Sequence, residues 1–172
     1  MAVVKVEMTF WVSDEKPAEL VKIDVHKDWA PLGAQRFLDL VQQGYYNEVR
    51  VARVIDGFMA QFGINGDPKI YEEVGNKQIK DDPVKKSNTR GMISFAMRGP
   101  DTRSCQIFIN YGNNGNLDSQ GFSPFAEVTD GMAAVDVLHR QECDQSRMKS
   151  EGMAYLKAFP KLSYVKEAKI VG

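Results

Sequence analysis

Residues 49–62, which read VRVARVIDGFMAQF, point to the class of fold. Two short segments rich in β-branched and aromatic residues, 49–55 and 58–62, are separated by the turn-forming pair Asp56-Gly57. Segments of this length and composition, bounded by Gly or Asp, are typical of β-strands. The stretch therefore predicts two strands of a mainly β protein.

Toward the N-terminus, the chain predicts two longer strands. In residues 4–12, apolar side chains occupy every second position, from Val4 to Val12, and polar ones such as Lys5 and Glu7 lie between them. Residues 21–25 alternate in the same way after a turn-forming segment. We therefore expect a hairpin of two half-buried strands at the beginning of the fold.

Between residues 31 and 44 the period changes, with apolar side chains at Ala34, Phe37, Leu38 and Val41. This spacing predicts an amphipathic helix, and residues 132–138 predict a second, shorter one. The remaining strands are expected at residues 91–97, 106–110, 125–128 and 164–171. Because strands and helices do not alternate, the pattern favours an antiparallel barrel or sandwich capped by helices.

Composition limits the class of function. The chain has 172 residues, which predicts one domain over residues 1–172, and its 22 basic and 23 acidic residues leave a net charge of −1. This balance argues against bulk binding to nucleic acid or to an anionic membrane. Cys105 and Cys143 are too far apart in sequence to indicate a zinc motif or a disulfide framework. With no secretion signal and no apolar run of membrane-spanning length, we expect a soluble cytoplasmic protein.

Arg53 is the residue that fits a purely structural interpretation least well. It shares one side of its predicted strand with Val49, Val51 and Ile55, and burying an unpaired guanidinium is costly. One interpretation is an edge arginine that extends to water. The other is a binding groove, because Gln61 and Gln106 also place single amides beside apolar side chains.

Other chemistries find little support. The two histidines, His26 and His139, form no metal-binding motif and suggest no catalytic triad. The glycine-rich residues 63–67 lack the Lys-Ser/Thr of a phosphate-binding loop, and residues 113–118 do not have the spacing of a calcium loop. We therefore expect neither a metal nor a cofactor.

The order of several motifs resembles the cyclophilin family. These motifs are RVIDGFMAQ at 53–61, GMISFA at 91–96 followed by Gly99-Pro100, QIFI at 106–109, FAEVTDGM at 125–132 and FPKL at 159–162. The resemblance extends over the whole chain. It implies a closed eight-stranded antiparallel β-barrel capped by two α-helices. It also implies a peptidyl-prolyl cis-trans isomerase that acts on Xaa-Pro bonds and assists protein folding.

The resemblance also implies roles for ten residues. Arg53 would donate to the prolyl nitrogen, and Gln61 would orient Arg53 or the substrate carbonyl. Phe58 would act with them as the third catalytic residue and contribute to the proline pocket. Ala96 and the backbone of Met97 would pair with the peptide, and Gln106 would line an adjoining subsite. The other residues of the proline pocket would be Met59, Phe108, Leu117 and Phe122.

Three positions depart from the family pattern. Val51 and Met97 replace a usual Phe and Asn, and Asn116 stands where many members have the tryptophan that hydrogen-bonds cyclosporin. We therefore expect catalysis with weakened cyclosporin binding. The expected partners are proline-containing peptides and unfolded proteins, bound by a monomer. Two alternatives remain open at this point: a proline-peptide binding module with little catalysis, and a barrel that holds a small apolar ligand.

Overall fold

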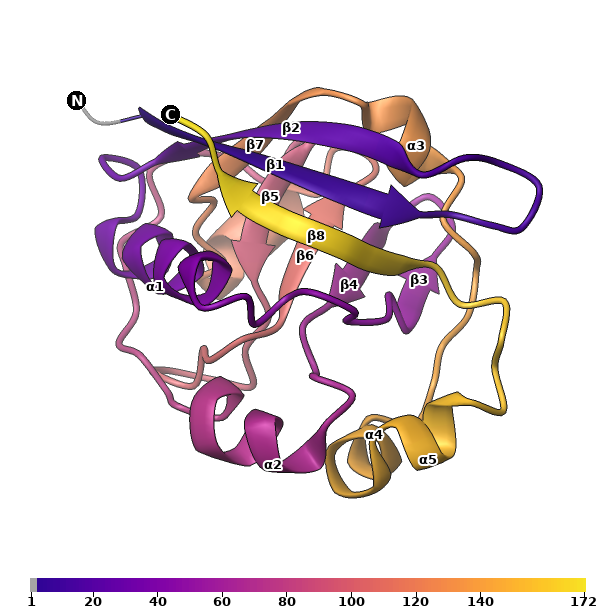
Figure 1. The fold of residues 1–172 in the computed structure, drawn as a ribbon. Helices are drawn as coiled ribbons and strands as arrows, with labels where there is room; N and C mark the ends of the chain where they lie inside the picture. Colours follow the sequence, from indigo (N-terminus) through magenta and orange to yellow (C-terminus); the bar gives the residue numbers. More distant parts are fainter. Residues whose placement is uncertain (1–2) are drawn as a thin grey trace.

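Residues 3–172 are described by a computed structural model, in which eight strands form one curled antiparallel sheet with helices around it (Figure 1). The strands are β1 (Val3–Trp11), β2 (Glu19–His26), β3 (Arg53–Ile55), β4 (Met59–Phe62), β5 (Met92–Phe95), β6 (Ile107–Asn110), β7 (Ala126–Asp130) and β8 (Tyr164–Ile170). The α-helices are α1 (Pro31–Gln42), α2 (Pro68–Ile70), α3 (Met132–Asp136), α4 (Gln145–Glu151) and α5 (Met153–Leu156). A π-helical turn, η1 (Tyr71–Gly75), and a 3₁₀ helix, η2 (Gly115–Gln120), complete the elements.

The predicted strands are all present, and β1 and β2 form the expected hairpin. In β1 the even-numbered side chains Val6, Met8 and Phe10 are buried, as the alternation requires. The strand predicted at residues 49–55 is shorter than expected, because only Arg53–Ile55 pairs with β4. Residues 49–52 lead into the strand and remain largely outside the ladder.

The strand order is β3-β4-β6-β5-β7-β2-β1-β8, which leaves β3 and β8 at the two edges. The mainly β, eight-stranded antiparallel prediction is confirmed, although "closed" overstates the hydrogen bonding. Among residues 3–172, β3 and β8 form no ladder with each other. The chain just before β3 spans the gap with a few bonds, including those from Glu48 N to Val165 O (2.7 Å) and from Val51 N to Ser163 O (2.8 Å).

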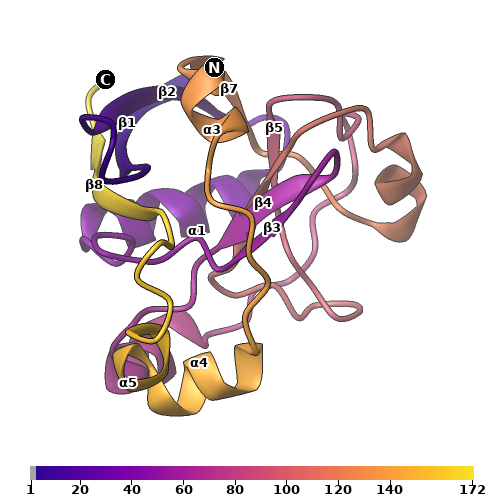
Figure 2. The same ribbon diagram turned by 90° about the vertical axis from the view of Figure 1, so that its right-hand side faces the viewer.

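The two predicted helices are present as α1 and α3. Pro31 occupies the first turn of α1, and the buried face of the helix, which includes Phe37 and Val41, packs toward β2 and β8. Three further short helices were not expected. Figures 1 and 2 show α2, α4 and α5 gathered at one end of the molecule, with α3 at the other. In the described part of the chain we find no helix with the length and apolar character needed to cross a bilayer.

Among residues 3–172, two separate groups of buried apolar side chains fill the interior. The larger group lies between the sheet and α1 and extends from Val6 near the N-terminus to Ala168 in β8. The smaller group contains Met59, Phe108 and Leu117, which come from β4, β6 and η2. This second group does not belong to the main core.

Candidate active site

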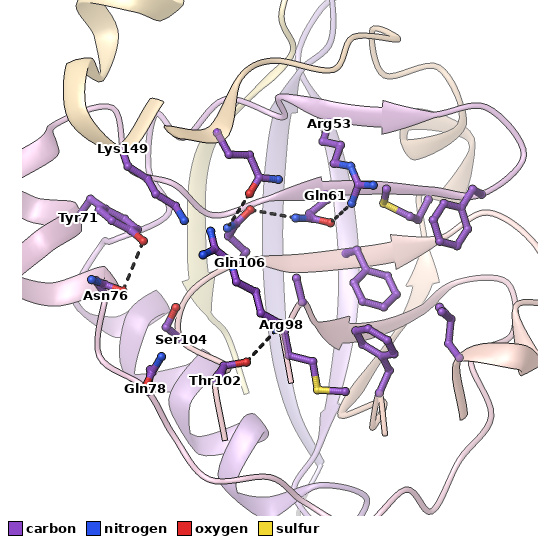
Figure 3. A pocket seen from close by; sticks show the side chains of 18 residues that line it. Arg53, Gln61, Tyr71, Asn76, Gln78, Arg98, Thr102, Ser104, Gln106 and Lys149 are labelled. Carbon is purple, nitrogen blue, oxygen red and sulfur yellow. Dashed lines mark hydrogen bonds between the residues drawn. The ribbon is translucent and has the colours of Figure 1, made fainter. Parts of the chain in front are cut away.

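One cavity of about 310 Å³ lies beside β4 and β6, and all ten residues predicted for the site line it (Figure 3). They are Arg53, Phe58, Met59, Gln61, Ala96, Met97, Gln106, Phe108, Leu117 and Phe122. The size is at the lower end of the range for pockets that bind small molecules or a few residues of a peptide. The structure thus brings together residues that lie up to 69 positions apart in the chain.

Strand register places the polar residues of the cavity next to one another. Arg53 lies opposite Gln61 across β3 and β4, and Gln61 lies opposite Phe108 across β4 and β6. Arg53 Nη1 donates to Gln61 Oε1 (3.1 Å), and Gln61 Nε2 donates to Gln106 Oε1 (2.9 Å). Gln61 is buried, so its two bonds satisfy an amide that would otherwise be costly to desolvate. The Arg53 guanidinium is thereby held at the edge of the cavity (Figure 3).

A second contact fixes Arg53 from outside. Its Nε donates to Glu142 Oε2 (3.1 Å), and its side chain is 34% exposed. Within residues 3–172, Nη2 of Arg53 forms no hydrogen bond, so part of the guanidinium stays free to donate to a ligand. Arg53 is therefore a paired, half-exposed cation beside a pocket. It lies on an edge strand, as the first interpretation of the sequence expected, and it lines a cavity, as the second one did.

The smaller hydrophobic group forms the apolar end of the cavity. Met59, Phe108 and Leu117 are buried, and Phe58 and Phe122 pack against them while remaining partly exposed. The rings of Phe108 and Phe122 meet edge to face with centroids 5.7 Å apart. Because this group opens to a cavity and is separate from the main core, the geometry favours a ligand pocket over ordinary core packing.

The chain after β5 borders the same cavity. Ala96 N already donates to Gln106 O (2.9 Å), so this amide is not available to a peptide. The backbone amide of Met97 makes no hydrogen bond within residues 3–172, and Met97 is half-buried. Of the two residues predicted to pair with a peptide, Met97 is thus the one with a free backbone donor.

The other two departures from the family pattern lie away from the cavity lining. Val51 is fully buried in the main core, and Asn116 is exposed on η2. The substitution at Val51 therefore changes core packing behind the site. The substitution at Asn116 changes a surface beside it.

Eight residues of the cavity were not predicted from the sequence: Tyr71, Asn76, Gln78, Arg98, Thr102, Ser104, Gln145 and Lys149. They lie in η1 and the loop after it, in the loop between β5 and β6, and in α4. Arg98, Thr102 and Ser104 lie between the GMISFA motif at 91–96 and the QIFI motif at 106–109, so these flanking motifs were the available signal for them. Nothing in the local pattern indicated that α4 reaches the cavity.

Within residues 3–172, one group of side chains has the composition of a metal site. It consists of Asp24, His26 and Glu127, on β2 and β7, outside the cavity lining. Asp24 also pairs with Lys5 (3.0 Å), and His26 contacts Glu127 (2.8 Å), so these groups already have partners. The cavity itself offers hydrogen-bond donors, acceptors and an apolar pocket.

Comparison with known proteins agrees with this geometry. Residues 8–157 match the family described as cyclophilin type peptidyl-prolyl cis-trans isomerase/CLD. Peptidyl-prolyl cis-trans isomerase-like 3 of Dictyostelium discoideum is 35% identical over 130 residues, covering 72% of this chain and 78% of the relative. The human protein of the same name is 36% identical over 126 residues, covering 70% and 76%.

Solved structures give the same fold. A Cryptosporidium parvum cyclophilin type peptidyl-prolyl cis-trans isomerase superposes with a TM-score of 0.72 at 21% identity, over 99% of each chain. A crystal structure of that protein in the presence of the dipeptide Ala-Pro superposes with a TM-score of 0.70, over 98% of this chain. From the family match and its relatives, the chain belongs to the cyclophilin-type peptidyl-prolyl cis-trans isomerases.

Proposed function

We propose that this member of the family isomerises Xaa-Pro bonds of peptides and unfolded proteins in the cavity described above, with Arg53 as the catalytic residue. The observation that carries the proposal is a guanidinium held by Gln61 and Glu142 at the edge of an apolar pocket. A proline ring fits the apolar end formed by Phe58, Met59 and its neighbours. The peptide backbone then lies near Arg53 and the free amide of Met97.

The chemistry needs no nucleophile or metal. Rotation about a peptide bond is slow because amide resonance must be broken, at a cost of about 18–20 kcal/mol. As the bond twists, the prolyl nitrogen recovers a lone pair, and a cationic donor aimed at that nitrogen stabilises the twisted state more than the planar one. The free Nη2 group of Arg53 suits this role because Nε and Nη1 are already occupied.

The first experiment measures isomerisation of a short Xaa-Pro peptide by exchange NMR in the wild type and in Arg53→Ala. We expect the variant to lose about 100- to 1000-fold in kcat/KM, the usual loss when a charge-stabilising donor is removed. Arg50→Ala is the matched control, because Arg50 lies three residues away and does not line the cavity. Binding of the peptide without acceleration by the wild type would favour a proline-peptide binding module instead.

We also propose that cyclosporin binds weakly. The proposal is supported by Asn116, which lacks the indole donor that many family members have at the aligned position. The wild-type inhibition constant should lie above the nanomolar range, and Asn116→Trp should lower it about 3- to 10-fold, the value of one added hydrogen bond. A nanomolar constant for the wild type, measured by inhibition of the exchange rate, would contradict this.

Finally, we propose that residues 1–172 act as one domain and as a monomer in the cytoplasm. The proposal is supported by the main core, whose members come from both ends of the chain, and by the free, buried Cys105 and Cys143. Sedimentation velocity tests the monomer, and denaturant unfolding that is not a single transition would argue against one domain. Cell fractionation tests the location.

A further inference from the structure

The end of the cavity opposite its apolar end is polar and positively charged. Tyr71, Asn76 and Gln78 line it on one side, and Arg98 and Lys149 extend into it from the β5–β6 loop and from α4 (Figure 3). Among residues 3–172, the charged residues that line the cavity are Arg53, Arg98 and Lys149, and none of its lining residues is an aspartate or a glutamate. The cavity therefore attracts negative charge.

Arg98 and Lys149 differ from Arg53 in having no acidic partner. Arg53 is paired with Glu142, whereas no carboxylate among residues 3–172 lies within ion-pair distance of Arg98 or Lys149. Their side-chain nitrogens also form no hydrogen bond with the described residues, although the backbone amide of Arg98 donates to Thr102 Oγ1 (2.8 Å). Both cations thus retain their full capacity to donate to a ligand.

The two cations also lie near each other. Figure 3 shows the amino group of Lys149 and the guanidinium of Arg98 turned toward the same part of the cavity. Burial, and after it the charge of Arg98, lower the pKa of Lys149. Two positive groups held together without a counterion repel each other, so an anion placed between them is stabilised by both.

Neutral donors surround the same space. Among residues 3–172, Ser104 Oγ has one side-chain hydrogen-bond partner, the sulfur of Cys105 at 3.9 Å, and the Asn76 side chain uses only its oxygen, as acceptor for Tyr71 Oη (3.4 Å). The Nδ2 group of Asn76 and the Gln78 amide form no hydrogen bond with residues 3–172. An oxyanion here would meet two cations and up to three neutral donors.

We propose that this polar end is a subsite for an anionic side chain of the substrate, a carboxylate or a phosphate, so that the enzyme prefers proline peptides with an acidic residue close to the proline. The inference rests on the proposed isomerase function and adds a substrate class to it. The cavity is continuous from the proline pocket to Arg98 and Lys149, so one peptide can occupy both ends.

Another interpretation is that Lys149 has only a structural role. Its Nζ lies 5.9 Å from the ring centroid of Tyr71, at the outer limit for a cation–π interaction. That contact explains the position of Lys149 but not the presence of Arg98 on the opposite wall. The substrate subsite accounts for both.

The test uses capped peptides with one proline, in which Glu or Gln is placed in turn at each flanking position. Exchange NMR gives kcat/KM, and chemical-shift titration of the same samples gives the affinity. At one position or more, the wild type should favour Glu over Gln about tenfold, as expected for hydrogen bonds to a charged group. The preference should fall as salt is added.

Variants assign the preference to the two cations. In the double variant Arg98→Gln/Lys149→Gln, the Glu/Gln ratio should fall to near one. Arg147→Gln is the control, because Arg147 lies on the exposed face of α4, and its ratio should stay at the wild-type value. Arg98→Glu should shift the preference toward peptides with Lys at the same position. A third peptide with phosphoserine at the same position distinguishes phosphate from carboxylate. A phosphoserine/Gln ratio above the Glu/Gln ratio assigns the subsite to phosphate, and an equal ratio assigns it to carboxylates.

A Glu/Gln ratio near one at every position in the wild type, or an unchanged ratio in the double variant, overturns the subsite. Because the ratio is also measured as an affinity, it tests the subsite even if no peptide is isomerised. Absence of acceleration with an intact Glu preference would refute the proposed function and leave the subsite standing. Acceleration of isomerisation without a Glu preference would refute the subsite and leave the proposed function standing.

Discussion

At the residue scale, Gln61 is the centre of the site. Its oxygen accepts from Arg53 and its nitrogen donates to Gln106, which in turn approaches Gln145 on α4 (3.5 Å). This chain of amides connects Arg53 on β3 to the far wall of the cavity. Gln61 is therefore a positioning residue for Arg53 in addition to any contact it makes with substrate.

Replacing Gln61 by Ala should reduce kcat about tenfold with a smaller effect on KM, because Arg53 keeps its charge and loses one of the two bonds that aim it. Gln61→Glu keeps the acceptor for Arg53 and should recover part of the rate. Steady-state kinetics from exchange NMR separates kcat from KM. If Glu gives no more recovery than Ala, the orientation role is wrong.

At the element scale, α1 depends on a residue far away in the chain. Ala30, at its N-cap, offers no side-chain oxygen, and Asp82 accepts from Leu32 N (3.1 Å) and Gly33 N (2.9 Å) instead. A carboxylate at this end also interacts favourably with the helix dipole. The same Asp82 pairs with Arg103 (3.1 Å), which is 1% exposed and also donates to Lys80 O.

Replacing Asp82 by Asn should lower the free energy of unfolding by about 3–5 kcal/mol, because it leaves the buried Arg103 charge without its closest carboxylate. Asp81→Asn is the control. Asp81 lies 3.8 Å from Arg103 with a side chain 38% exposed, so its loss should cost below about 1 kcal/mol. Equal losses in the two variants, measured by chemical denaturation, would contradict the assignment.

At the scale of the whole molecule, buried tyrosines join distant parts of the chain. Tyr45 Oη donates to Gly63 O (2.7 Å), Tyr46 Oη to Cys105 O (2.8 Å) and Tyr111 Oη to Val135 O (2.8 Å). Burial raises the pKa of Tyr45 and Tyr46 well above the ordinary value near 10 and raises that of Tyr111 to about 12. Each hydroxyl is therefore held in its neutral, donating form by the folded structure.

These shifts predict a loss of stability in alkali. Below pH 10 these tyrosines are neutral in both states, and their contribution to the free energy of unfolding is complete. Above pH 10 the same tyrosines ionise first in the unfolded chain, so the free energy of unfolding falls as pH rises toward the folded-state pKa values. Absorbance of tyrosinate from these residues should appear together with loss of circular dichroism. Tyr46→Phe should lower stability at pH 7 by about 1 kcal/mol and show a shallower alkaline decline. Ionisation of Tyr46 before unfolding would refute this.

The two long N-terminal strands were predictable because the alternation of apolar and polar residues is a local property of the chain. Residues 4–12 and 21–25 show the pattern clearly, and β1 and β2 follow it. The short helices α4 and α5 were not predictable, because seven and four residues carry too little periodicity. The predicted start of the 49–55 strand was also wrong, because β3 begins only at Arg53. The residue at which a ladder begins is decided by its pairing with the partner strand, which the local sequence does not show.

By itself, the sequence determined the class of fold, because strand periodicity is a local property of the chain. The order of its motifs resembles the cyclophilin family, and that resemblance, rather than periodicity, identified ten residues that line the cavity. Only the tertiary structure decided what completes the cavity. Arg98 and Lys149 come from a loop and a helix that are brought together by packing at long range, and no local pattern reports whether a cation finds a partner. The same holds for Arg103, whose burial beside Asp82 follows from where α1 docks.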